Sequence, residues 1–129
     1  MSGAAAMNRF SRWSYAAKPK SWPKLIVPML LGQALGAYLS GGVSWGAALF
    51  GVLFVVADLL YIVFLNDWAD ARVDRIKREM FPAGCSPKTI PAGILNARSL
   101  LAAGLGAGLV ALIIALVFGG GLARPWLAP

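Results

Sequence analysis

Residues 43–74, VSWGAALFGVLFVVADLLYIVFLNDWADARVD, decide how this chain folds. The part before Asn66 is apolar apart from Asp58 and, at about 1.5 Å per residue, is long enough to cross roughly 30 Å of hydrocarbon as a helix. The part that follows contains three of the five acidic residues of the chain, Asp67, Asp70 and Asp74. On a helix that turns about 100° per residue, these three lie within roughly 60° of one another. The stretch therefore predicts a membrane helix that ends in an acidic face at the boundary with water.

Composition indicates an integral membrane protein. The chain has 129 residues, of which 59% are hydrophobic and 13% are charged, which is too apolar for an ordinary soluble domain. Two more apolar runs accompany the central one, so we expect an all-α, multi-pass bundle with three spans, at about residues 25–42, 43–66 and 94–118. Residues 1–24 form a basic juxtamembrane arm, residues 25–129 contain the transmembrane helices, and residues 66–93 connect the second and third spans and contain the aspartate motif.

The basic residues predict the orientation and exclude some functions. The net charge of +7 comes from two basic blocks, residues 9–24 and 72–98, which flank the same side of the membrane. By the positive-inside rule, the N-terminus and the aspartates lie in the cytoplasm, at the inner membrane if the source is bacterial. The chain has no histidine, so the usual Ser-His and Cys-His nucleophile arrangements are missing. Nothing in the basic blocks indicates a base-stacking surface for nucleic acid.

The grouped carboxylates predict a metal site. Like charges 4 Å apart repel by roughly 4 kcal/mol per pair at an effective dielectric constant near 20, so either a bound cation or nearby arginines and lysines must compensate. Oxygen ligands without histidine favour Mg²⁺, which commonly shares its coordination with substrate phosphates. Five basic residues are candidates for binding such phosphates: Arg72, Arg75, Lys77, Arg78 and Lys88. The alternative is a solvated helix on which Asp70, Asp74 and Arg78 form a row of weak pairs.

Two other features leave more than one interpretation open. Trp13, Tyr15 and Trp22 alternate with cations in the N-terminal arm, as expected of side chains at the headgroup level. We favour anchoring for this arm over a role in closing a phosphate site. Asp58 is an intramembrane carboxylate, which is a functional-site hypothesis by default. Because the membrane portion of the chain offers no cation, we favour a protonated Asp58, or one paired with another helix, over a catalytic one.

The pattern of Asn66, Asp67, Asp70 and Asp74 at the inner end of a second span resembles the first aspartate-rich motif of the UbiA superfamily of intramembrane prenyltransferases. The segment from Lys18 to Pro23, followed by Pro28 and Gly32, is also similar to the start of those enzymes, especially the dihydroxynaphthoate branch beside the 4-hydroxybenzoate polyprenyltransferases. The resemblance extends from about residue 13 to the third span.

The resemblance implies transfer of an isoprenoid chain from a polyprenyl diphosphate to a small, usually aromatic acceptor in quinone biosynthesis. Asn66, Asp67, Asp70 and Asp74 would be the catalytic residues, and Asp67, Asp70 and Asp74 would hold Mg²⁺ against the diphosphate. The five basic residues named above would assist in binding it. The lipid bilayer is the expected environment.

The sequence also departs from the superfamily pattern. The resemblance implies nine spans and a second aspartate-rich motif, whereas this chain shows three apolar runs and has no acidic residue after Glu79. We therefore expect an N-terminal portion of an enzyme, or a piece completed by another chain that carries the remaining helices, and no catalysis by the 129 residues alone. The alternatives are a non-catalytic membrane subunit or scaffold and, less favoured because Ala71 occupies a required glycine position, a CDP-alcohol phosphotransferase-like enzyme.

Overall fold

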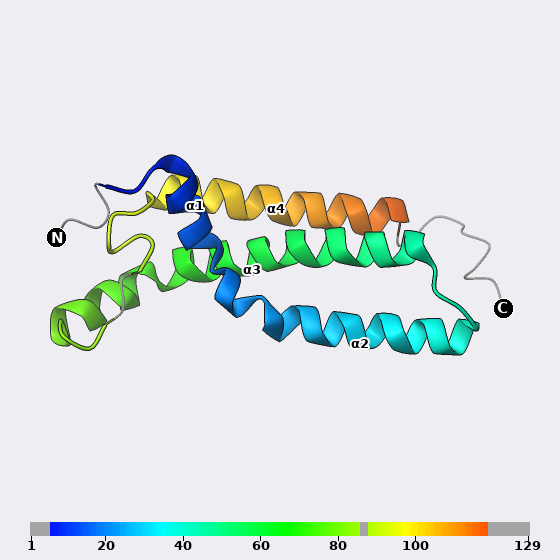
Figure 1. Ribbon diagram of the computed structural model, residues 1–129. Coiled ribbons are helices and arrows are strands. Elements are labelled where there is room, and N and C mark those ends of the chain that lie inside the picture. The colour runs from blue at the N-terminus through cyan, green and yellow to red at the C-terminus, as the bar shows by residue number, and fades with distance from the viewer. Residues whose placement is uncertain (1–5, 86–87, 119–129) are drawn as a thin grey trace.

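The computed structural model describes residues 6–85 and 88–118, and within these residues it is helical without any strand (Figure 1). The elements are α1 (Arg9–Ala17), the short 3₁₀ helix η1 (Pro19–Ser21), α2 (Pro23–Ser40), α3 (Trp45–Met80) and α4 (Ala97–Phe118). The predicted all-α class is confirmed. The outer parts of the predicted arm and membrane region, residues 1–5 and 119–129, lie outside the described residues.

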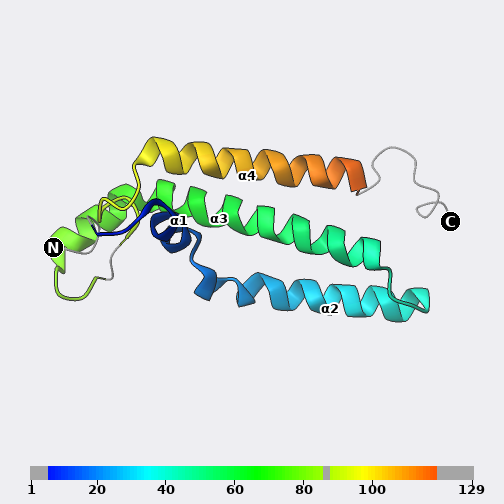
Figure 2. The same cartoon turned by 45° about the horizontal axis from the view of Figure 1, so that its top comes forward.

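The three long helices run antiparallel to their sequence neighbours, with α3 in the middle (Figure 1). Helix α4 lies along the apolar part of α3, and α2 lies on another side of α3 and contacts it less extensively. The short α1 lies across α3 near the end of the bundle where α4 begins, as Figures 1 and 2 both show. This crossing places the N-terminal arm beside the aspartates of α3.

Helix α3 is continuous from the apolar run through the aspartate motif. The side chain of Ser44 caps its first turn by accepting a hydrogen bond from Ala47 N. The helix contains no proline and ends at Met80, just before Phe81 and Pro82, where the proline disfavours further helix. Its 36 residues span about 54 Å, which exceeds the roughly 30 Å of a hydrocarbon core. The second half therefore extends beyond the apolar layer and carries the aspartates with it.

Two of the three long helices pass a length and hydropathy test for membrane spans, namely α3 and α4. In the most apolar 18-residue stretch of each helix, only 22% of α3 and 17% of α4 is buried. Most of this apolar surface therefore faces outward, unlike that of the core helix of a soluble protein. Helix α2 has 18 residues and begins with Pro23 and Lys24, which lower its hydropathy. Two spans are supported among the described residues, and the predicted third is not confirmed.

Glycines allow α3 and α4 to approach closely. A Cβ atom added at Gly104 would lie 2.9 Å from Leu65 Cδ2, and one added at Gly108 would lie 2.6 Å from Tyr61 Cδ2. No atom lies within 4 Å of a Cβ built at Gly106, which is on the same helix. Gly104 and Gly108 therefore lie at the contact between the two helices, and Gly106 does not.

The N-terminal arm folds as a helix that packs on α3. Its first turn is capped by Asn8 Oδ1, which accepts from Ser11 N at 2.8 Å. The Trp13 ring meets Phe64 edge to face, with centroids 5.7 Å apart, and Ala16 is fully buried. Phe10, in contrast, is 81% exposed. One side of α1 thus packs against the bundle while the other remains open.

We predict that Gly104→Leu destabilises the packing of α3 against α4 by about 1–3 kcal/mol, because the larger side chain must displace Leu65. Unfolding of the purified protein by added SDS, followed by circular dichroism, measures this change. Gly106→Leu is the matched control and should be neutral or stabilising. Equal effects of the two substitutions would contradict the proposed close contact.

We also predict that Trp13→Ala loosens α1, since it removes the ring that packs on Phe64. Hydrogen exchange of the α1 amides should become about tenfold or more faster, because truncating a packed aromatic side chain costs more than 1.4 kcal/mol. Phe10→Ala, on the open side of the same helix, should leave the exchange rates nearly unchanged. If both variants exchange at the wild-type rate, α1 does not depend on this contact.

Candidate functional site

Asp67 is the buried acid of the aspartate motif, with 8% of its surface exposed. Its Oδ1 atom accepts a charge-assisted hydrogen bond from Lys18 Nζ, and the two residues form an ion pair. Its Oδ2 atom accepts a hydrogen bond of 2.6 Å from Thr89 Oγ1. Both carboxylate oxygens therefore have hydrogen-bond donors from segments distant in sequence. Lys18 precedes α3 in the chain, and Thr89 follows it.

Lys18 reaches Asp67 from a strained backbone position. It caps the C-terminus of α1 with φ 48° and ψ 59°, and it is the only non-glycine residue with positive φ in the described part of the chain. This left-handed conformation costs a residue with a side chain about 1–2 kcal/mol. The Trp22 indole donates to Ala17 O at 2.8 Å and so ties η1 back to α1 across this turn. The turn directs the lysine side chain toward α3.

Thr89 is held in a compact loop that lies against α3. Its side chain is 1% exposed, and its carbonyl oxygen accepts hydrogen bonds from Ile94 N at 3.0 Å and Leu95 N at 3.2 Å. The preceding residue, Lys88, accepts from Ala92 N at 2.8 Å through its carbonyl oxygen. Lys88 Nζ lies 3.7 Å from Asp74 Oδ2, which forms a second acid-lysine pair two turns along α3 from the first. The loop therefore supplies partners to both aspartates.

The other motif residues are more exposed. Asn66 and Asp70 are solvent-exposed, whereas Asp74 is partly buried. Among residues 6–85 and 88–118, no three acidic, cysteine or histidine side chains converge as a metal-binding group. The compensation observed for Asp67 and Asp74 thus comes from lysines, which is one of the two possibilities that charge repulsion predicts.

The donor chemistry of this face nevertheless fits Mg²⁺. This ion needs oxygen ligands and is commonly held by one or two protein carboxylates, with waters and substrate phosphates in the remaining positions. Asp67 and Asp74 lie on one face of α3, and each forms an ion pair with a lysine. A site of this kind does not require three converging carboxylates before the substrate is bound.

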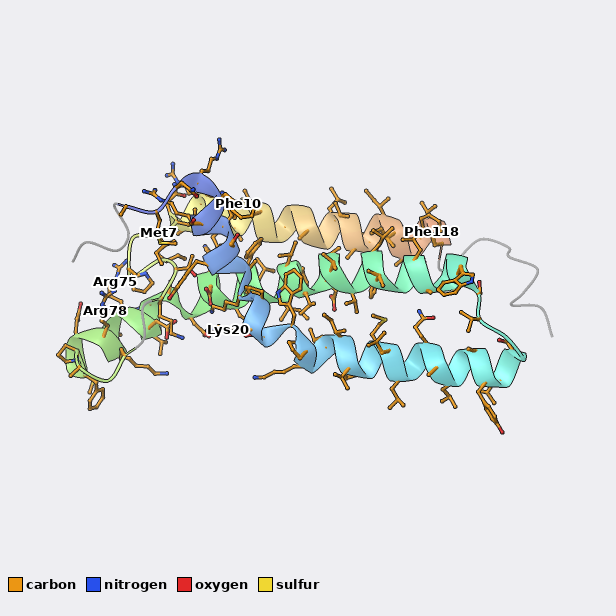
Figure 3. All side chains as sticks on the ribbon, viewed as in Figure 1. Met7, Phe10, Lys20, Arg75, Arg78 and Phe118 are labelled. Carbon is orange, nitrogen blue, oxygen red and sulfur yellow. The ribbon has the colours of Figure 1, made fainter. Side chains whose placement is uncertain are left out.

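Of the five basic residues predicted to bind phosphate, the structure brings Lys88 to the paired aspartates. Arg72 and Arg75 instead line a separate hollow of about 470 Å³ with Trp68 and Ile90. Lys77 and Arg78 are exposed in the last turn of α3. Figure 3 shows Arg75 and Arg78 on the part of α3 that extends beyond α1, away from Lys20. Four of the five therefore do not pair with the aspartates, and Lys88 pairs with Asp74.

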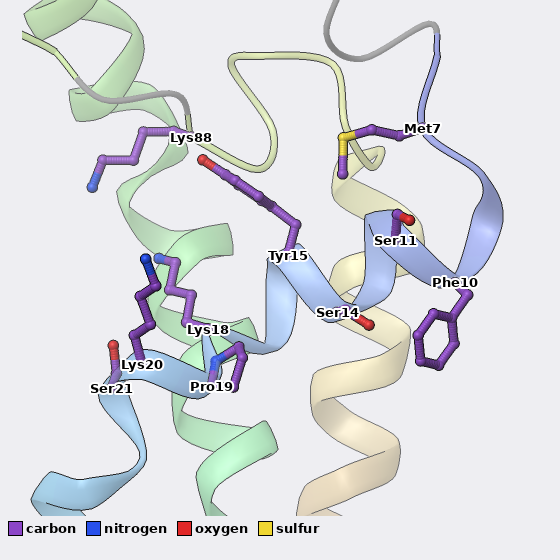
Figure 4. A pocket seen from close by; sticks show the side chains of 10 residues that line it. All are labelled: Met7, Phe10, Ser11, Ser14, Tyr15, Lys18, Pro19, Lys20, Ser21 and Lys88. Atoms are coloured by element: carbon purple, nitrogen blue, oxygen red, sulfur yellow. The ribbon is translucent and has the colours of Figure 1, made fainter.

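Beside the ion pairs lies a cavity of about 610 Å³ (Figure 4). Its lining combines three lysines with hydroxyl groups and a few apolar side chains. The lining residues are Met7, Phe10, Ser11, Ser14, Tyr15, Lys18, Pro19, Lys20, Ser21 and Lys88. Figure 4 shows Lys18 and Lys20 side by side, both extending toward the side of Lys88. The two lysines that pair with Asp67 and Asp74 thus also form the basic end of this cavity.

Sequence reasoning did not identify Lys18, Lys20 or Thr89 as site residues. The lysines belong to a segment that we expected to anchor the arm, and the contact of Lys18 with Asp67 joins residues 49 positions apart. The available signal was complementary charge, because residues 1–24 have basic residues and no acid while the motif gathers most of the acids. That signal does not say which lysine meets which aspartate.

Asp58 lies away from this site. It lines a groove of about 510 Å³ between α3 and α4, together with Tyr61 and Leu109. Asp67 faces α1 and the loop instead. Asp58 therefore does not contribute to the face that carries Asp67 and Asp74.

The chain is similar to two mycobacterial enzymes named 1,4-dihydroxy-2-naphthoate octaprenyltransferase. It is 29% identical over 123 residues to the Mycobacterium tuberculosis enzyme, and the match covers 94% of this chain and 39% of that enzyme. It is 30% identical over 64 residues to the Mycobacterium leprae enzyme, covering 50% of this chain and 21% of that enzyme. No family model and no solved structure matches the chain. The chain thus spans about two fifths of the length of the Mycobacterium tuberculosis enzyme. Its resemblance to UbiA-type prenyltransferases is confirmed by this sequence similarity.

Proposed function

We propose that this chain forms the part of a membrane prenyltransferase that binds the diphosphate of a polyprenyl donor. The observation that carries the proposal is a pair of ion pairs on one face of α3. Asp67 and Asp74 each pair with a lysine, and both lysines line the same cavity. Oxygen ligands for a divalent cation and amines for a phosphate thereby stand side by side. The similarity to the two octaprenyltransferases supports the same assignment.

Asp67, Asp70 and Asp74 are the residues that would hold Mg²⁺, with the Asn66 amide beside them. The bound ion would supply positive charge against the departing diphosphate. The exposed position of Asp70 leaves its carboxylate free to turn toward a ligand. Lys88 Nζ pairs with Asp74 Oδ2 at 3.7 Å and lines the cavity, and its amine would donate to phosphate oxygens bound there.

The lysines and the apolar side chains would assist ionisation of the polyprenyl diphosphate in two ways. Preorganised cations near the phosphate stabilise the negative charge that builds as the allylic carbon-oxygen bond breaks. The apolar walls of α3 and α4 keep water from the cation left on the isoprenoid chain. An acidic face at the end of a membrane helix suits a substrate that has a charged head and a lipid tail.

The acceptor we propose is a small aromatic compound, by analogy with the dihydroxynaphthoate in the names of both relatives. We propose a multi-pass arrangement in which α2 also enters the bilayer, with the N-terminus and the aspartates in the cytoplasm. Further helices, from a longer protein or a complementary chain, would cover the apolar outer faces of α2 and α4. Leu31 on α2 and Leu116 on α4 are examples of the exposed residues on these faces.

Titration calorimetry of the chain in lipid nanodiscs with geranyl diphosphate tests the proposed binding. We expect binding that requires Mg²⁺ and weakens about tenfold or more in Asp67→Asn, because a charge-bearing ligand is removed. Glu79→Gln is the matched control, since Glu79 is an exposed acid near the end of the same helix. Binding of equal strength with and without Mg²⁺ would contradict the proposal.

A chimera tests the catalytic assignment. The 123-residue region of similarity in the Mycobacterium tuberculosis enzyme is replaced by this chain, and formation of prenylated naphthoate is measured in membranes. We expect transfer by the chimera and a loss of about 100-fold or more in its Asp67→Asn variant, which is the scale typical of losing an electrostatic stabiliser. A well-expressed chimera whose Asp67→Asn variant keeps its rate would refute a role for Asp67 in transfer.

A further inference from the structure

Lys18 forms an ion pair with Asp67 and also lines the cavity beside this pair. We propose that Lys18 is a resident counter-cation that a divalent metal ion displaces from Asp67, and that the released amine then binds the diphosphate oxyanion in the cavity. The inference rests on the proposed function and deepens it. It adds a residue that binds the diphosphate directly, and it makes the binding of metal and diphosphate interdependent.

The burial of Asp67 explains why a resident cation is needed. A carboxylate with 8% exposure loses most of its hydration, and leaving such a group without a charged partner is costly. Lys18 and Thr89 together satisfy both oxygens. A divalent cation that arrives at Oδ1 meets a position already held by Lys18 Nζ, so the two cations compete for the same atom.

The backbone conformation of Lys18 supports a functional role for this residue. An αL conformation is sparsely populated by residues other than glycine and asparagine, and such strain concentrates at ligand sites and switches. Lys18 adopts it, with φ 48°, at the junction of α1 and η1. Its side chain is 32% exposed, so the flexible stem has room to move from Asp67 into the adjoining cavity.

The charge of the cavity favours a diphosphate over a carboxylate. Lys18, Lys20 and Lys88 all line it. If metal ions take over Asp67 and Asp74, two of these amines lose their acidic partners and the cavity gains positive charge. Several amines with neighbouring hydroxyls, such as that of Tyr15, match the many oxygens of a diphosphate better than the single charge of an aromatic carboxylate.

The test measures metal and anion separately on the full chain in nanodiscs. Mn²⁺ binding without any anion is followed by electron paramagnetic resonance, and inorganic pyrophosphate binding is followed by calorimetry at a fixed, saturating concentration of Mg²⁺. We expect Lys18→Met to bind Mn²⁺ about tenfold more tightly and Mg²⁺-pyrophosphate about tenfold more weakly, the scale of one charged hydrogen bond. Opposite signs in the two assays are the signature of exchange.

Two further variants control for folding and general charge. Lys20→Met removes an amine of the cavity outside the Asp67 pair, so it should weaken pyrophosphate binding and leave Mn²⁺ affinity unchanged, even if Lys18→Met folds poorly. Lys24→Met removes an exposed lysine that does not line the cavity and should change neither. Circular dichroism establishes that each variant is folded.

Three outcomes would overturn the inference. Unchanged or weaker Mn²⁺ binding by Lys18→Met would exclude exchange at Asp67, while the proposed function would survive if Asp67→Asn still abolished metal binding. Wild-type affinity of Lys20→Met for pyrophosphate would exclude the cavity as its site. Binding of 2-naphthoate that depends on Lys18 and Lys20, with pyrophosphate unaffected, would assign the cavity to a carboxylate instead.

Discussion

The organisation of the end of the bundle that carries the aspartates depends on one buried carboxylate. Asp67 accepts a hydrogen bond at each oxygen, from Lys18 on one segment and from Thr89 on another. Because an unpartnered acid in this position would be costly, the helix that carries it requires both segments to dock. A single side chain on α3 thus fixes the arm that precedes the first long helix and the loop that precedes the last one. The cavity between them follows from that docking.

The length of α3 connects this site to the membrane. A continuous helix of 36 residues is longer than a hydrocarbon core is thick, so its apolar half and its acidic half lie in different solvents while remaining mechanically one piece. Helix α4 packs along the apolar half, where Gly104 and Gly108 let Leu65 and Tyr61 approach its backbone. A ligand with an apolar tail and an anionic head would be met by matching surfaces at both ends of this helix.

The sequence predicted those features that depend on local pattern. The apolar run predicts a long helix that reaches the motif, and the aspartate spacing predicts which acids share its face. The pairing of Lys18 with Asp67 was not predictable in the same way, because it depends on a left-handed turn after α1 and on a docking geometry that no local pattern encodes. The same reason explains the basic residues: Arg72 and Arg75 are close to the motif in sequence, yet helix rotation places them along another hollow. Lys18 and Lys20 are distant in sequence and line the cavity.

The central claim is that Lys18 and Asp67 interact directly and thereby couple the arm to α3. A double-mutant cycle with Lys18→Met, Asp67→Asn and the combined variant measures this interaction, with the free energy of opening of α1 taken from amide hydrogen exchange at each corner. The account predicts a coupling energy of about 1.5–3 kcal/mol, the range for a hydrogen bond to a charged group. Additive effects of the two substitutions, with a coupling energy near zero, would contradict it.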